Sequence, residues 1–70
     1  MRAVWRGDRL LARRKQLGLT TAALAEKVGC KRPLISMWAH NNATPSGHFL
    51  VMLGAVLNCE PKELYDFTEE

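Results

Sequence analysis

Residues that typically end a helix recur along the chain, and the intervals between them are long enough only for short helices. Each follows a segment whose apolar residues have helical spacing, and the four are Gly18, Gly29, Asn41 and Asn58. Strand-like alternation is not evident between them. A chain of 70 residues has the length of one domain. The pattern therefore predicts an all-α, compact five-helix fold: a single domain over residues 1–70, with its core in 7–65 and a frayed acidic tail in 66–70.

Helix-starting signals set the other boundaries. Thr20 is a good N-cap residue, Ser46 is expected to cap the fourth helix, and Glu60 stands before Pro61 at the start of a short fifth one. The predicted helices cover residues 7–17, 21–28, 32–40, 47–57 and 61–65.

The segment 29–42, GCKRPLISMWAHNN, contains a proline that the pattern places in the first turn of the helix 32–40. The missing N–H of Pro33 costs nothing there, because the first amides of a helix have no intrahelical partner. Ile35 and Trp38 share the face that the spacing turns toward the core. The opposite face carries Arg32, Pro33, Ser36, Met37 and His40.

Charge is distributed unevenly. Residues 1–32 carry nine of the ten Lys and Arg residues with two acidic ones, whereas residues 33–70 carry one basic and five acidic residues. A basic half of this kind favours a polyanionic partner. Two cysteines, Cys30 and Cys59, are too few for a disulfide scaffold and indicate small buried side chains in a reducing compartment.

Other classes of function find no support in the sequence. No apolar run approaches the ~18–20 residues that span a membrane, so we expect a cytoplasmic protein. Cysteine and histidine spacings typical of zinc sites are not found, and neither is a Gly-rich phosphate loop or a recognisable nucleophile. We therefore expect no enzyme activity, no metal and no cofactor.

Five motifs occur in order over most of the chain. They are GDRLLARRKQLGLT (7–20), LAEKVG (24–29), the core residues Ile35, Ser36 and Trp38, N-x-x-x-P (41–45) and LNCEPKELY (57–65). In these motifs the sequence resembles the helix-turn-helix domain shared by lambda-type phage repressors, Cro proteins and the XRE group of bacterial regulators. The resemblance implies that helix 21–28 lies on the DNA backbone and helix 32–40 enters the major groove.

Site residues follow from that resemblance and from the chemistry of the side chains. The residues expected to face bases are Lys31, Arg32, Pro33, Ser36 and Met37. The residues expected to contact phosphates are Arg14, Thr21, His40, Asn42 and Thr44. Arg is the commonest reader of guanine, and side chains without donors can pack on thymine methyl groups. Thr21 stands where the family often has Gln, and Arg14 faces Ala39 instead of an acidic partner, which leaves it free for phosphate or merely solvated.

The implied function is a sequence-specific transcriptional regulator, a small repressor that binds double-stranded DNA at a palindromic operator as a homodimer. It would be nucleoid-associated when bound. We expect no small-molecule effector to bind within these 70 residues. The alternative is an antitoxin-like or adaptor module whose helix-turn-helix domain mainly binds a protein partner.

Overall fold

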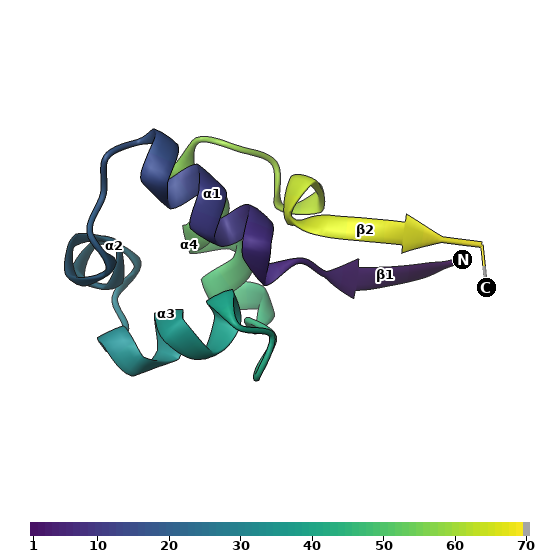
Figure 1. Ribbon diagram of the computed structural model, residues 1–70, viewed down its shortest axis with the longest axis horizontal. Coiled ribbons are helices and arrows are strands. Elements are labelled where there is room, and N and C mark those ends of the chain that lie inside the picture. The colour runs from purple at the N-terminus through teal and green to yellow at the C-terminus, as the bar shows by residue number, and fades with distance from the viewer. Residues whose placement is uncertain (70) are drawn as a thin grey trace.

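The computed structural model describes residues 1–69. Within them the chain forms four α-helices, one 3₁₀ turn and a two-stranded antiparallel sheet. In chain order the elements are β1 (Arg2–Trp5), α1 (Gly7–Gln16), α2 (Thr21–Val28), α3 (Arg32–Ala39), α4 (Gly47–Leu57), the 3₁₀ turn η1 (Pro61–Leu64) and β2 (Tyr65–Thr68). Figure 1 shows the helices gathered into one body, from which the paired strands project as an arm.

The predicted helix ends are confirmed. The residue after or near each helix end has a positive φ, which is 68° at Gly18, 87° at Gly29, 61° at Asn41 and 54° at Asn58. The Ala23 N–H donates to Thr20 Oγ1 at 3.0 Å, so Thr20 caps α2 as expected. Ser46 occupies the N-cap position of α4, but its side chain accepts no capping hydrogen bond from the described residues.

All four helices, the 3₁₀ turn and β1 contribute to the core of residues 1–69. The buried apolar residues are Trp5, Leu10, Leu24, Ala25, Val28, Ile35, Trp38, Leu53, Leu57 and Leu64. The Trp38 ring packs against Phe49 with centroids 5.4 Å apart, which ties α3 to α4. Cys30 and Cys59 are half-buried against this core, and burial raises the pKa of both thiols.

The fold is compact and mostly helical, as predicted, but the predicted fifth helix is wrong, and the described residues also contain a two-stranded sheet. Residues 61–64 form a single 3₁₀ turn, in which Glu63 Oε2 accepts the Glu60 N–H at 2.6 Å, and Tyr65 already begins β2. The sheet pairs the two ends of the chain, with Arg2 opposite Thr68 and Trp5 opposite Tyr65. Residues 66–68 of the predicted frayed tail therefore belong to a strand, and Glu70 lies outside the described residues.

Trp5 fastens the arm to the body. Its side chain is 7% exposed, and its ring meets Tyr65 edge-on at a centroid distance of 5.5 Å. The indole Nε1–H donates to the main-chain oxygen of Trp38 at 2.8 Å. Trp5 therefore covers the edge of the core from outside the helices.

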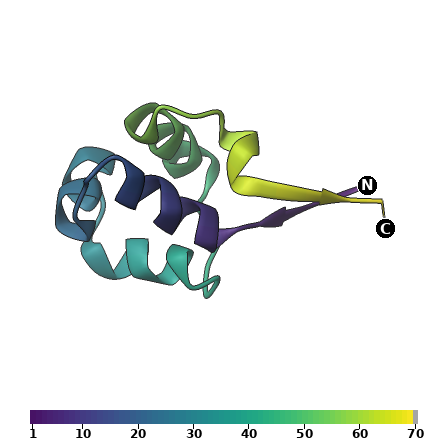
Figure 2. The same cartoon turned by 45° about the horizontal axis from the view of Figure 1, so that its top comes forward.

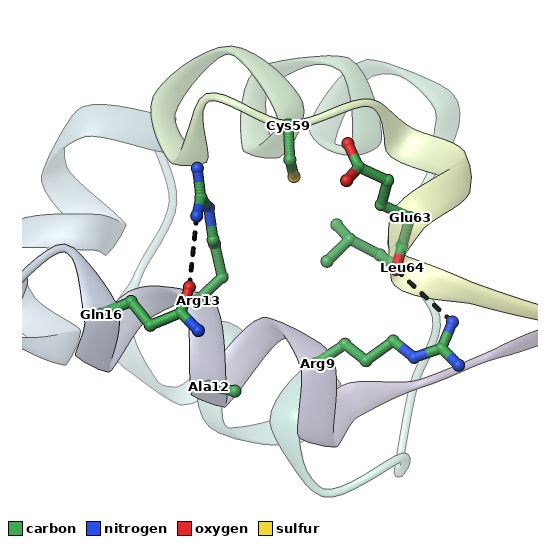
Figure 3. A pocket seen from close by; sticks show the side chains of 7 residues that line it. All are labelled: Arg9, Ala12, Arg13, Gln16, Cys59, Glu63 and Leu64. Atoms are coloured by element: carbon green, nitrogen blue, oxygen red, sulfur yellow. Dashed lines mark hydrogen bonds between the residues drawn. The ribbon is translucent and has the colours of Figure 1, made fainter.

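Two arginines of α1 hold the C-terminal segment in place. Arg13 donates to the main-chain oxygens of Leu57 at 2.8 Å and Asn58 at 3.1 Å, which are carbonyls at the end of α4 that have no helical partner. Arg9 donates to the oxygen of Tyr65 at 2.5 Å. Figure 3 shows both side chains leaving α1 and reaching toward this segment across a hollow of about 300 Å³.

Gly7 marks a close approach between the start of α1 and the end of α3. A Cβ at this position would lie 2.4 Å from the main-chain oxygens of both Trp38 and Ala39. The Gly7 N–H donates to Asn41 Oδ1 at 2.9 Å. Glycine is therefore required here for space.

We predict that Gly7→Ala lowers the free energy of unfolding by about 1–3 kcal/mol or more, because the added carbon collides with main-chain atoms. Urea denaturation followed by circular dichroism measures the change. Gly47→Ala is the matched control, since Gly47 also begins a helix but has open space around a Cβ. That variant should be neutral or slightly stabilising. Equal effects of the two substitutions would contradict the proposed close approach.

Candidate nucleic-acid interface

The exposed face of α3 has the composition that the sequence predicts. Arg32, Pro33, Ser36, Met37 and His40 are all exposed, as is Lys31 immediately before the helix. Met37 is 43% exposed and is one of five large apolar residues that the described part of the chain leaves exposed. On the opposite face, Ile35 and Trp38 are each 2% exposed.

Pro33 lies in the first turn of α3, as expected. Lys31 is the N-cap residue with extended backbone, φ −88° and ψ 150°, and its side chain makes no capping hydrogen bond. The Leu34 N–H donates to the oxygen of Lys31 at 3.0 Å. Because Pro33 has its φ fixed near the helical value, it favours a helix start that no side chain caps.

His40 closes the other end of this face. Its Nδ1 lies 2.8 Å from the oxygen of Ser36. A carbonyl oxygen can only accept a hydrogen bond, so Nδ1 carries the proton. In a neutral ring Nε2 is then an acceptor. His40 can therefore donate to a phosphate through Nε2 only when the ring is charged.

The predicted phosphate contacts outside α3 come from the segments before and after it in the chain. Asn42 and Thr44 are exposed in the loop between α3 and α4, and Thr21 is half-buried at the first position of α2. Arg14 is half-buried, and its Nη1 donates to the main-chain oxygen of Leu19 at 2.6 Å. One side of the Arg14 guanidinium therefore holds the loop between α1 and α2, a contact that the sequence did not indicate.

Asn41 has a second role that the sequence reasoning missed. The sequence predicts a helix-stopping residue at this position, and its φ of 61° agrees. Its side chain also accepts the N–H of Gly7. A signal was available, because an asparagine at a position that suits glycine indicates that the amide side chain is used.

The family model described as Helix-turn-helix matches residues 10–64. The chain belongs to the helix-turn-helix family. Repressor protein C2 of Salmonella phage P22 is 40% identical over 58 residues, which is 83% of this chain and 27% of that protein. The chain thus spans about a quarter of the length of this curated relative.

Solved structures agree with this membership. The P22 C2 repressor in complex with a synthetic operator has a TM-score of 0.81 and 40% identity, over 83% of this chain and 88% of that one. SinR from Bacillus subtilis has also been solved in complex with DNA. It has a TM-score of 0.77 and 36% identity, over 83% and 94% of the two chains. The expected relationship to phage repressors is therefore confirmed.

Two other kinds of site receive no support from residues 1–69. No three His, Cys, Asp or Glu side chains in this part of the chain are grouped so that they could hold a metal ion. None of the helices described has the length and apolar character needed to cross a membrane.

Substitutions on the exposed and buried faces of α3 should have different effects on the free energy of unfolding. We predict that Met37→Ala changes the free energy of unfolding by less than about 0.5 kcal/mol, as for most exposed positions. Ile35→Ala should cost about 2–5 kcal/mol, because it leaves a cavity in the core. Urea titration of both variants provides the measurement, and a large loss from Met37→Ala would show that this face is packed and not available to a ligand.

Proposed function

We propose that this chain is the DNA-binding domain of a sequence-specific repressor, which inserts α3 into the major groove of a palindromic operator as a homodimer. The observation that supports it best is the exposed face of α3 with Lys31 and Arg32 at its N-terminal end, in a member of a family whose solved relatives include a repressor bound to an operator. In this mode of binding the first residues of the recognition helix contact base edges.

The absence of ion pairs at the N-terminal end of α3 supports its proposed contact with bases. Neither Lys31 nor Arg32 forms an ion pair within residues 1–69, whereas Arg6 pairs with Asp8 at 2.8 Å and Arg9 lies 3.8 Å from Asp66. The guanidinium of Arg32, at the N-terminal end of α3, is therefore available for a bidentate hydrogen bond to guanine O6 and N7. Pro33 and Met37, which have no donors, would then pack on thymine methyl groups.

The remaining polar residues would fix the position of the domain on the duplex. We propose that Thr21 at the start of α2, and His40, Asn42 and Thr44 at and after the end of α3, contact sugar and phosphate and set the register without reading sequence. Arg14 retains free N–H groups beyond its bond to Leu19, and we assign it a phosphate contact through them. Nothing in the comparisons favours an adaptor module that mainly binds protein, and the relatives are named as regulators and not as enzymes.

Arg32→Ala tests the base-reading role. After the preferred duplex has been selected from a random pool, the variant should bind it about 10- to 100-fold more weakly and lose preference at one base position. Its circular dichroism should stay helical. Lys62→Ala removes an exposed positive charge outside the candidate interface and should bind like the wild type. Unchanged affinity in Arg32→Ala would refute this reading of α3.

Thr21→Gln tests the backbone contact at the start of α2. The longer amide reaches further toward a phosphate, so affinity should rise by a similar factor for preferred and unrelated duplexes, because phosphate contacts carry no sequence information. Electrophoretic mobility shift titrations on both duplexes measure this. A drop in affinity would show that Thr21 does not lie against the backbone as proposed.

A further inference from the structure

The arm has two edges that differ in how they are protected. The Arg6 N–H donates to the oxygen of Leu64 at 2.9 Å, immediately beyond the Trp5–Tyr65 pair. Hydrogen-bonded and non-hydrogen-bonded pairs alternate along an antiparallel ladder. Val4 and Arg2 therefore turn their main-chain groups toward β2. Ala3 turns its N–H and C=O toward the opposite edge, away from β2.

The outer edge of β2 is blocked by side chains. There, Tyr65 and Phe67 are the residues that turn outward. The Tyr65 oxygen accepts from Arg9, and the Phe67 N–H donates to Asp66 Oδ1 at 3.2 Å. Charged side chains that occupy main-chain groups are a common protection against edge-to-edge pairing.

The outer edge of β1 is open. No hydrogen bond within residues 1–69 joins the outward N–H or C=O of Ala3, and Ala3 is exposed. An exposed strand edge of this kind is a template for another extended strand. Both strands of residues 1–69 are already paired with each other, so within these residues the chain has no strand left to cover this edge.

We propose that β1 pairs antiparallel with β1 of a second copy of the chain, about a two-fold axis at Ala3, to give a four-stranded sheet of order β2-β1-β1-β2. The proposal rests on the proposed function in that it supplies the interface of the homodimer. A two-stranded sheet is marginally stable by itself, and two further strands make it a sheet of ordinary size.

The register about Ala3 suits the side chains. It places Ala3 opposite the partner's Ala3, Arg2 opposite the partner's Val4, and Met1 opposite the partner's Trp5, so no like charges oppose each other. Alternate residues share a face of a strand, and Met1, Ala3 and Phe67 therefore extend the face that Trp5 and Tyr65 begin. Met1 is 82% exposed and Phe67 is 53% exposed in the single chain. Pairing would place the exposed Met1 beside the small exposed part of the partner's Trp5 ring, where a thioether contact is favourable.

The position of the arm fits two-fold binding to DNA. Figures 1 and 2 show the arm at one end of the longest dimension of the molecule, with the start of α3 toward the other end. That dimension is 36 Å. A two-fold axis at Ala3 places the two bodies at opposite ends of the joined sheet. The two copies of α3 then lie on opposite sides of this axis, as binding to the two half-sites of a palindrome requires.

Cross-linking tests the axis directly. In a Cys30→Ala, Cys59→Ala background, Ala3→Cys should give a disulfide-linked dimer under mild oxidation, because directly opposed residues of a hydrogen-bonded pair lie about 5.5 Å apart at Cα. Arg2→Cys lies beside the axis but out of register, and Phe67→Cys lies on the outer strand of the proposed sheet. Neither should cross-link efficiently. Cross-linking of Phe67→Cys without Ala3→Cys would overturn the proposal in favour of the β2 edge.

Ala3→Pro tests the same edge without a cross-link. It removes an N–H that the single chain does not use, and proline is tolerated on an edge strand whose N–H faces solvent. Sedimentation equilibrium should show a dimer dissociation constant raised at least about tenfold. Leu17→Asp, which alters an exposed apolar residue elsewhere on the surface, should leave the dissociation constant unchanged. A wild type that stays monomeric on a palindromic duplex, or a dimer lost in Leu17→Asp but kept in Ala3→Pro, would overturn the proposal.

A duplex that carries one half-site separates this proposal from the proposed function. Ala3→Pro should bind the half-site with wild-type affinity and lose tight binding to the full palindrome. If neither the wild type nor any variant binds a duplex, the proposed function fails. If Ala3→Pro loses binding to the half-site while the wild type keeps it, Ala3 does more than contact the second copy, and the dimer proposal fails.

Discussion

The structure depends on the junction between the start of α1 and the end of α3. The last carbonyls of a helix lack intrahelical partners, and here the Trp38 oxygen accepts the indole N–H of Trp5 at 2.8 Å. The side chain of Asn41, just beyond α3, accepts the N–H of Gly7 at 2.9 Å. Because Gly7 has no side chain, the two helix ends can approach closely enough for both bonds. The buried face of α3 is held by Ile35 and Trp38, its C-terminal end is held by this junction, and its N-terminal end is left exposed.

The basic half of the chain has two separate uses. Arg9, Arg13 and Arg14 all donate to main-chain oxygens of other segments, and the planar guanidinium with its several donors suits this role. These arginines stabilise the arrangement of α1 against the loops and the C-terminal segment. Counting charges therefore overstates the number of residues available to a polyanion. Lys31 and Arg32 make no ion pair within residues 1–69. They are the basic residues that stand exposed at the start of α3.

The sequence predicted the features that depend on local geometry. Helix ends at Gly29 and Asn58, the cap at Thr20 and the helix start at Pro33 each depend on a few neighbouring residues, and the structure confirms them. The two faces of α3 follow from helical periodicity alone. The resemblance supplied the expected roles of those faces, which no local pattern contains.

The arm escaped prediction because its strands come from the two ends of the chain. Each has four residues, and the alternation of Tyr65 and Phe67 with Asp66 and Thr68 is too short to be distinguished from a helical turn without its distant partner. The bond from Arg14 to Leu19 was missed for a related reason, since it depends on how the loop between α1 and α2 folds back. Non-local contacts of this kind are decided by the packed structure.

Trp5 connects the proposed dimer contact to α3. It belongs to β1, and its indole holds the end of α3, so under the proposed pairing one residue contacts both the partner strand and α3. A second copy that orders β1 would also order the end of α3. DNA that orders α3 would by the same contact favour β1 in its paired position, because coupling between two binding events is reciprocal. Dimerisation through the arm and operator binding through α3 would then strengthen each other, and the Trp5–Trp38 hydrogen bond would carry part of that coupling.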